Sequence, residues 1–234
     1  TIPGSTVCLV PRLIDLFSRS FPVLRFVTPD HLIKYRKNYE GKFSAQIHLA
    51  SLGSYFRNNI TDFQRVKSAY LKADVQLTAH FRSALKQPTN VVCGLSWRSK
   101  NHEFGESKSL TLSSLAPLLC SKGVDFVDLQ YGDTTDEINK LREQHDIALH
   151  QVNEVDNFHD IDSLASLINA CDIVITVSNT TAHLAAALGK PVLVLLPNTP
   201  SLFWYWHLDR PDSPWYPSAV LLRQTTPGDW QSVI

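Results

Sequence analysis

Short apolar runs alternate with amphipathic stretches through the part of the chain after residue 89. The apolar runs are bounded by turn residues, which is typical of buried strands. The stretches between them carry apolar residues at helical spacing. The pattern predicts strands over 90–97, 124–130, 147–152, 172–177 and 192–196, and helices over 112–120, 134–145, 161–171 and 181–188. Strands that alternate with helices of this length indicate an α/β fold with a parallel sheet and right-handed crossovers.

The first 88 residues follow a less regular pattern. They predict one strand–helix–strand unit over 6–10, 12–20 and 24–28, a short strand over 45–49 and a helix over 75–85. One such unit is too small for a complete nucleotide-binding domain. We therefore expect a partial α/β domain and linker over 1–88, with the linker near Gln87–Pro88, followed by a Rossmann-like domain over 89–234.

Composition narrows the function classes. With 234 residues, of which 44% are hydrophobic and 19% charged, the chain can bury a core and is not disordered. Lys and Arg together number 22, as do Asp and Glu, so the formal net charge is zero and the main argument for a nucleic-acid-binding surface is missing. No apolar run approaches a membrane span, and no signal-peptide pattern is present. The chain starts at Thr1 and contains no Met, so we expect a piece of a longer protein.

Cysteine usage favours a reducing compartment. The four cysteines are far apart, lie in apolar stretches and lack the spacing of a zinc site. We interpret them as small buried apolar residues. Together with the composition, this predicts a soluble cytoplasmic protein.

The strand-to-helix turn SNTTAH is the strongest local signal for chemistry. Open parallel sheets bind ligands at the carboxyl ends of their strands, where free helix N–H groups can hold a diphosphate. Ser178, Asn179, Thr180 and Thr181 could add side-chain contacts to those amides. An ordinary capped helix without a ligand explains the same residues, because capping residues are common. His183, in the first turn, would either contact phosphate or belong to the core.

The loop after the strand over 90–97 is a second candidate, because it carries Arg98, Lys100 and Lys108. These cations could neutralise a leaving nucleoside diphosphate, although the charges alone favour a solvated polar loop. No GxGxxG or GxxxxGK[ST] motif occurs, which argues against a dehydrogenase and a P-loop NTPase. Asp160-Ile161-Asp162 has the form of a metal-binding D-x-D, but its place before a helix favours N-capping, so we expect no metal.

The aromatic run Phe203–His207 leaves two interpretations open. It could form a stacking wall for a base or sugar, or it could be a packing surface between domains or subunits.

These segments together resemble glycosyltransferase family 9, the heptosyltransferase-like group of the GT-B superfamily, and especially its bacterial members linked to tetratricopeptide repeats. The similarity covers most of the chain and is carried by GLSWRSKN, FVDLQYGD, the long stretch FHDIDSLASLINACDIVITVSNTTAHLAAALGKPVLVLLP, and DSPWYPSAVLLRQ. The resemblance implies that the carboxy-terminal domain binds a nucleotide-diphospho-sugar, that the amino-terminal domain holds the acceptor, and that transfer is inverting without metal or other cofactor. It implies that Lys108 and the turn Asn179–His183 hold the diphosphate, with Thr180, Thr181 and Arg98 as further contacts.

The chain departs from the family pattern in two ways. Typical heptosyltransferases have Asp-Thr-Gly where this chain has Asn179-Thr180-Thr181, which weakens heptose as the donor sugar. The front half of the acceptor domain, which carries the catalytic base in that family, is missing from the sequence, so we name no base.

The predicted function is a glycosyltransferase that moves a sugar from a nucleotide-diphospho-sugar to a glycan, lipid or protein acceptor. The alternative is a non-catalytic scaffold, or an inactive fragment, that retains the GT-B fold. A nucleotide-dependent epimerase shares the fold class as a third reading.

Overall fold

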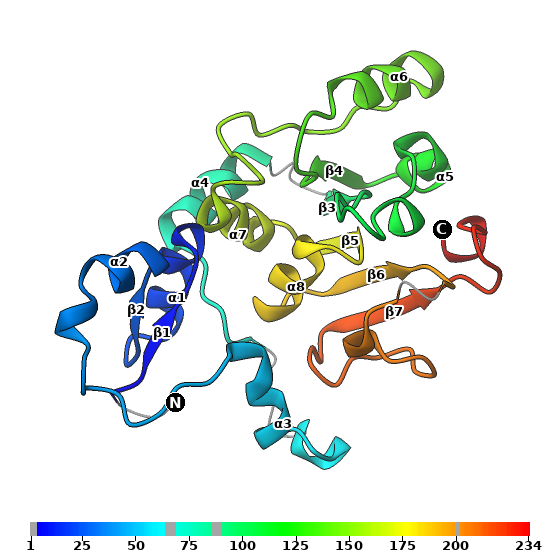
Figure 1. Ribbon diagram of the computed structural model, residues 1–234. Helices are drawn as coiled ribbons and strands as arrows, with labels where there is room; N and C mark the ends of the chain where they lie inside the picture. Colours follow the sequence, from blue (N-terminus) through cyan, green and yellow to red (C-terminus); the bar gives the residue numbers. More distant parts are fainter. Residues whose placement is uncertain (1–3, 64–68, 86–89, 200–201) are drawn as a thin grey trace.

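A five-stranded parallel sheet forms the centre of the molecule (Figure 1). The computed structural model describes residues 4–63, 69–85, 90–199 and 202–234. The strands follow the order β4-β3-β5-β6-β7, and every neighbouring pair is parallel. Their bounds are β3 (Val91–Ser96), β4 (Val124–Asp128), β5 (Ile173–Val177), β6 (Val192–Leu196) and β7 (Ala219–Arg223). The predicted α/β class with a Rossmann-like parallel sheet is confirmed.

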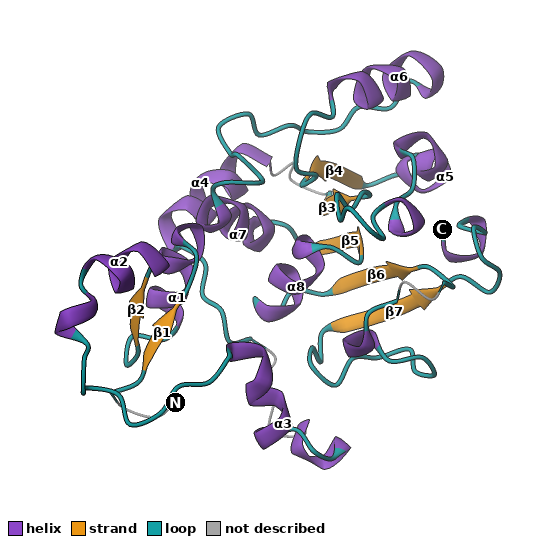
Figure 2. Ribbon diagram, in the orientation of Figure 1, coloured by secondary structure: helices purple, strands orange, loops and turns teal. Residues whose placement is uncertain are grey.

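Helices cover both faces of this sheet (Figure 2). Side chains alternate between the faces of a strand, so Val92, Val174 and Val194 join one buried cluster while Cys93 and Ile175 join the other. The first cluster includes residues of α7 (Ile161–Ala170) and α8 (Thr180–Ala187). The second includes residues of α5 (Ala116–Leu119), the 3-10 turn Leu112–Leu115 before it, and α6 (Thr135–His145). The predicted helices 134–145, 161–171 and 181–188 are therefore confirmed, with their bounds shifted by one residue at most.

Gly94 allows the middle of the sheet to pack closely. A Cβ atom at this position would lie 2.3 Å from Cδ1 of Leu129 and 3.1 Å from Sγ of Cys171. A side chain there would push Leu129 or the end of α7 away from β3, which is why a glycine fits inside a central strand.

The amino-terminal part contains the predicted strand–helix–strand unit. Its strands β1 (Thr6–Cys8) and β2 (Arg25–Val27) pair in parallel. A 3-10 turn, Pro11–Leu13, leads into the helix between them, α1 (Ile14–Ser20). This part also contains α2 (Pro29–Lys34), α3 (Gly53–Phe56) and α4 (Val75–Leu85), the last with the predicted bounds.

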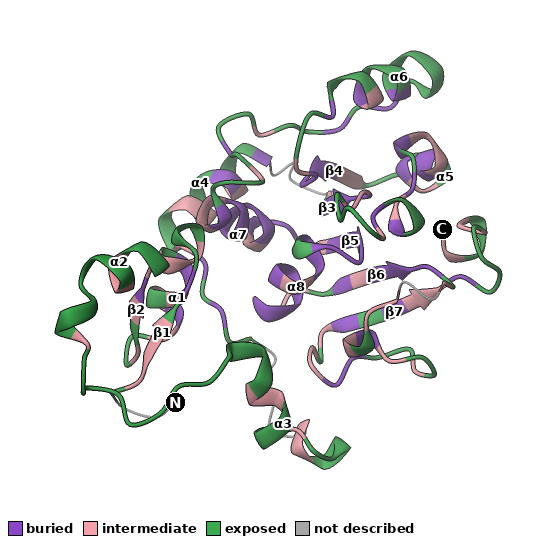
Figure 3. Ribbon diagram, viewed as in Figure 1, coloured by how far each residue is buried: buried purple, intermediate pink, exposed green. Residues whose placement is uncertain are grey.

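The amino-terminal part packs against α7. Phe81 and Leu85 of α4 belong to the same buried cluster as the inner residues of α7. The Arg19 guanidinium of α1 donates to both carboxylate oxygens of Asp162, at 2.7 and 2.6 Å. In Figure 3 the buried residues concentrate on the sheet, α7 and α8, whereas α2 and α3 are largely exposed. The domain boundary at residue 88 stays a prediction, and the linker near Gln87–Pro88 lies outside the described residues.

Two predicted strands were wrong. Residues 45–49 form no strand and are exposed, so no neighbouring strand shields their apolar side chains. In the segment 147–152 only His150 bridges to β4, opposite Val127, because polar residues flank the short buried positions Ile147 and Leu149.

One strand and two cysteines also differ from expectation. The strand β7 was missed, although AVLLR is a short apolar run between Pro217 and Gln224. Cys93 and Cys171 are buried as expected, whereas Cys8 and Cys120 are exposed. Among the described residues, no helix is long and apolar enough to cross a membrane.

Candidate functional site

The candidate site lies where the strand order reverses between β3 and β5. From β3 the chain crosses to β4 on one side, and the later strands add on the other side through β5. Loops leaving the carboxyl ends of two such strands diverge and open a crevice, which is where open α/β sheets bind ligands. The two predicted site segments, the loop 97–108 and the turn 178–183, follow these two strands.

Asn179 joins the two sides of this crevice. Its Oδ1 accepts from the backbone N–H groups of Thr181 and Ala182, at 2.9 and 3.4 Å, so it is the N-cap of α8. Its Nδ2 donates to Ser96 Oγ at 2.8 Å and to the Arg98 carbonyl at 3.1 Å. Both amide donors are thus used within the protein, and the Asn179 side chain shapes the turn.

Thr180 is the part of the turn that faces solvent. It is exposed at the first position of α8, whereas Thr181 behind it is buried. The eight-residue helix directs its N-terminal amide groups and the positive end of its dipole toward this turn. The geometry is compatible with an anion at Thr180.

Ser178 and His183 lie against aromatic residues. Trp206 Nε1 donates to Ser178 Oγ at 2.8 Å, and the His183 ring stacks on Trp206 with centroids 5.1 Å apart. His183 Nδ1 is 2.9 Å from the Tyr216 hydroxyl. Burial lowers the pKa of His183 to about 4. The imidazole is therefore neutral at neutral pH and can offer a hydrogen bond but no charge.

Lys108 presents an ammonium group that has no counter-ion among the described residues. The side chain is 1% exposed, and its Nζ has no hydrogen-bond partner among the described residues. The Nζ atom lies 3.6 Å from the centroid of the Phe203 ring and 5.9 Å from that of Phe104. Burial lowers the pKa of Lys108. A buried cation without a paired charge is costly, and an anion would satisfy it.

The loop that carries Lys108 is closed by its own hydrogen bonds. Ser109 Oγ accepts from Ser99 N at 2.9 Å and donates to the Gly105 carbonyl at 2.6 Å. A Cβ atom at Gly105 would lie 2.4 Å from the carbonyl oxygens of both Asn101 and Ser99. Only a glycine fits this turn, which leads directly into the 3-10 turn Glu106–Lys108.

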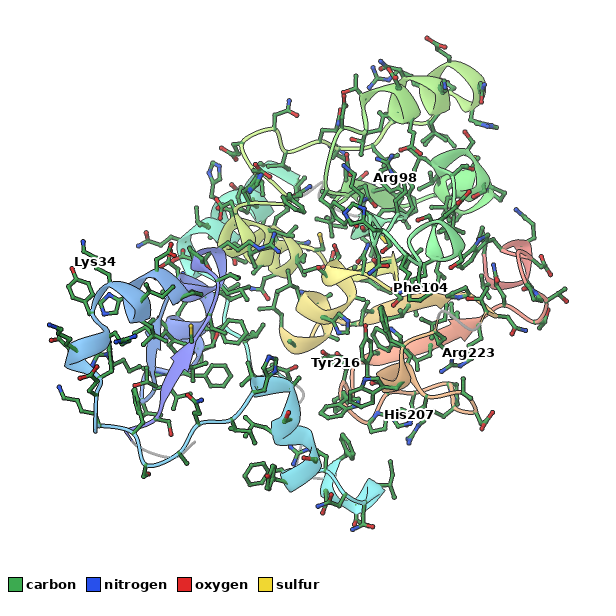
Figure 4. All side chains as sticks on the ribbon, viewed as in Figure 1. Lys34, Arg98, Phe104, His207, Tyr216 and Arg223 are labelled. Atoms are coloured by element: carbon green, nitrogen blue, oxygen red, sulfur yellow. The ribbon has the colours of Figure 1, made fainter. Side chains whose placement is uncertain are left out.

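Arg98 is directed away from Lys108. Its guanidinium lies 3.1 Å from Glu137 of α6 and donates to the Asp133 carbonyl at 3.1 Å. Figure 4 shows Arg98 beside β3 and β4, and Phe104 near the end of β6. The structure therefore brings only the Arg98 backbone to the turn, through Asn179, and an Arg98 contact with diphosphate stays a prediction.

Gln130 is a positioning residue that sequence reasoning missed. Its Oε1 accepts from Ser96 Oγ at 3.1 Å, from Trp97 N at 2.9 Å and from Arg98 N at 2.8 Å. One buried amide oxygen thus fixes the path of the chain where it leaves β3. The available signal was a polar residue at the carboxyl end of the predicted strand 124–130.

The D-x-D sequence is a helix start, as predicted. Asp160 Oδ1 accepts from Ser163 N at 2.9 Å, and Asp162 is paired with Arg19. Across the parts of the chain that the structure describes, no three His, Cys, Asp or Glu side chains are grouped to hold a metal ion.

Two cavities lie away from the crevice. One, of about 510 Å³, is lined by residues of the β6–β7 connection, and the other, of about 350 Å³, lies beside β4. Neither is lined by Lys108 or by the α8 turn.

Comparison with known proteins agrees with this geometry. Residues 142–229, which contain β5, α8, β6 and β7, match the model of glycosyltransferase family 9 (heptosyltransferase). This match supports the predicted similarity of the chain to glycosyltransferase family 9. The chain is 31% identical over 231 residues to Protein FlbA of Caulobacter vibrioides, covering 94% of this chain and 38% of FlbA.

One solved structure shares the fold at a TM-score of 0.50, and a second gives a lower score. The family 9 glycosyltransferase from Veillonella parvula DSM 2008 superimposes with a TM-score of 0.50 at 16% identity, covering 68% of this chain and 43% of that one. The ADP-heptose LPS heptosyltransferase II of E. coli gives a TM-score of 0.48 at 20% identity, covering 76% and 53%. The chain thus spans less than half of FlbA and less than half of the Veillonella protein.

Proposed function

We propose that this chain is the donor-binding part of a family 9 glycosyltransferase. In this proposal a nucleotide-diphospho-sugar binds at the crevice between β3 and β5, and its sugar is transferred to a glycan, lipid or protein acceptor. The observation that carries the proposal is the buried ammonium of Lys108 on the loop after β3, which has no hydrogen-bond partner in the part of the chain that the structure describes. A diphosphate is the ligand that would compensate such a charge beside a helix N-terminus.

The same groups would assist departure of the nucleoside diphosphate. Negative charge builds on the diphosphate as the glycosidic bond breaks, and fixed cations and amide dipoles stabilise that charge. Lys108 and the α8 turn at Thr180 would supply this stabilisation. Ser178, Asn179, Thr181 and His183 would hold the turn in shape, since their side chains are mostly buried or already bonded.

The wider setting is part of the same proposal. Inverting transfer without metal follows from the family resemblance, as does a tetratricopeptide region elsewhere in the full-length protein. The two buried, unpaired cysteines, Cys93 and Cys171, support a reducing, cytoplasmic compartment.

A non-catalytic scaffold is the competing function. It is favoured by Arg98 and Asn179, whose polar side-chain groups are largely engaged within the protein. A scaffold of this kind would retain the fold, and it would not need an unpaired ammonium group at Lys108.

Calorimetric titration separates the two functions. UDP, ADP, GDP and dTDP are titrated into the wild type, Lys108→Ala and the exposed control Lys100→Ala. We expect micromolar binding of one nucleotide, at least tenfold weaker in Lys108→Ala and nearly unchanged in Lys100→Ala, since loss of a charge-assisted contact costs about 1.5–3 kcal/mol. Flat titrations with all four nucleotides, on a folded sample, would overturn the proposed donor site and favour the scaffold or an inactive fragment.

A further inference from the structure

One short aromatic segment contacts both halves of the candidate site. Phe203 lies against the Lys108 ammonium, on the loop after β3. Trp206 bonds Ser178 and stacks on His183, at the start of α8. Tyr205, between them, stacks on Phe203 at 5.3 Å and meets the His183 ring edge-on at 5.0 Å. The aromatic run therefore spans from the cation to the helix turn.

The Phe203 ring replaces the carboxylate that a buried lysine usually has. A cation over an aromatic face is attracted by the ring quadrupole, most strongly when water is excluded. Lys108 makes this contact at 3.6 Å while being 1% exposed, and no salt bridge to it is found among the described residues. A carboxylate partner would compete with an incoming anion for the ammonium, whereas a neutral ring competes much less.

We propose that Phe203 is a positioning residue for anion binding: its ring face holds the Lys108 ammonium charged and in place until a diphosphate engages it. This inference rests on the proposed donor site and adds the residue that prepares its cation. It also gives the aromatic run a role in the site other than contact with the base or sugar.

The arrangement makes nucleotide affinity depend on pH in a defined direction. Burial already lowers the pKa of Lys108, and removing the ring would lower that pKa further. Since a diphosphate binds the protonated amine, affinity is full below the pKa of the free site and falls as pH rises through it. Removal of the Phe203 ring would therefore make the nucleotide affinity fall at a lower pH than in the wild type.

The neighbouring titratable groups do not produce the same effect. Burial raises the pKa of Tyr205 to about 12 and lowers that of His183 to about 4, so both stay neutral between pH 7 and 9. On the loop of Lys108, the side chains of Lys100, His102, Glu103 and Glu106 are exposed, and the partly buried Arg98 is paired with Glu137.

The test measures the dissociation constant of the nucleotide that binds best, from pH 7 to 9.5, for a set of variants. Phe203→Leu removes the ring, and Phe203→Tyr keeps the ring face. Phe104→Leu removes the more distant ring, and Lys108→Gln removes the titrating group. We expect Phe203→Leu to match the wild type within about twofold at pH 7 and to bind about tenfold more weakly at pH 9, the size of a desolvated cation–π contact. The dissociation constant of Phe203→Tyr should follow that of the wild type across the pH range. The dissociation constant of Phe104→Leu should change less than that of Phe203→Leu.

The outcomes are distinct. If Phe203→Leu keeps the wild-type pH profile, or Phe203→Tyr shifts as far as Phe203→Leu, the inference is overturned. If the profile of Lys108→Gln falls with pH as the wild type does, another group titrates and the inference is also overturned. A wild type that binds no nucleotide at any pH overturns the proposed function itself.

Discussion

Burial lowers the pKa of two basic side chains near the crevice, but they differ in their partners. His183 stays neutral, with Nδ1 close to the Tyr216 hydroxyl and its ring on Trp206. Lys108 has no hydrogen-bonding partner among the described residues, and its favourable contacts are aromatic rings. Burial of a basic group disfavours its charged form in both cases, but only the histidine avoids the cost at neutral pH.

His183 should make the fold sensitive to acid. Its pKa is about 4 in the folded chain and about 6.5 when unfolded, so the unfolded state takes up the proton first as pH falls. Stability is therefore full above about pH 6.5 and decreases as pH falls toward 4. We expect a loss of about 2 kcal/mol between pH 7 and 4.5, measured by urea unfolding.

The variant His183→Phe keeps a ring on Trp206 and removes the titration. The free energy of unfolding of this variant should change less between pH 7 and 4.5 than that of the wild type. Equal pH dependence in the two proteins would show that His183 is not the group responsible.

At the level of elements, α8 is fixed by its first residue. The helix is short and almost entirely buried, and Asn179 both caps it and binds it to the end of β3. The N-cap of α8 and the geometry of the crevice therefore depend on the same side chain. A change at Asn179 would move the N-terminus of α8 relative to the loop of Lys108.

Asn179→Asp tests this double role. Aspartate is as good an N-cap as asparagine, but it cannot donate to Ser96 or to the Arg98 carbonyl, and it would bury a charge beside that carbonyl. We expect a loss of about 2–4 kcal/mol in the free energy of unfolding, measured in urea.

The control is Asp160→Asn, at the exposed N-cap of α7. It should change stability by less than about 0.5 kcal/mol, because that cap makes no contact requiring one particular side chain. Equal effects at the two caps would contradict the bridging role of Asn179.

On the scale of the molecule, the part before residue 88 shares a core with the sheet. Phe81 and Leu85 of α4 pack in the cluster that contains α7 and α8, and Arg19 pairs with Asp162. The region that the sequence pattern separates as a different domain thus supports the helix that covers β3 and β5.

Phe81→Ala should therefore destabilise the sheet and not only the amino-terminal part. The side chain is 2% exposed, and its loss should cost about 3–4 kcal/mol. Unfolding followed by fluorescence of the buried Trp97 and Trp206 reports on the sheet half. Its midpoint should shift in Phe81→Ala and stay in Ile33→Ala, whose side chain is 76% exposed. An unchanged midpoint in Phe81→Ala would show that the two parts unfold independently.

The sequence predicted those features that local pattern encodes. The central strands and amphipathic helices followed from periodicity, and the cap at Asp160 followed from residue type. The two wrong strands failed because strand formation depends on a neighbouring strand, which a local pattern does not reveal.

The candidate site was predictable in position but not in detail. The crevice follows from topology, so the loop after β3 and the turn after β5 could be named in advance. The pairing of Arg98 with Glu137 and the ring beneath Lys108 could not, because each joins residues that are far apart in sequence and brought together only by the fold.

The strand order also determines when the crevice can exist during folding. Leu95 pairs with Asp128 of β4 and, on its other side, with Ile175 of β5, whereas Ile175 pairs with Leu193 of β6. The contact between β3 and β5 closes the longest loop of these three, and the entropy of closing a loop rises with its length. The crevice is thus created by the pairing with the largest entropic barrier. A chain that had formed the two flanking pairs alone would contain much of the sheet and still have no place for a ligand.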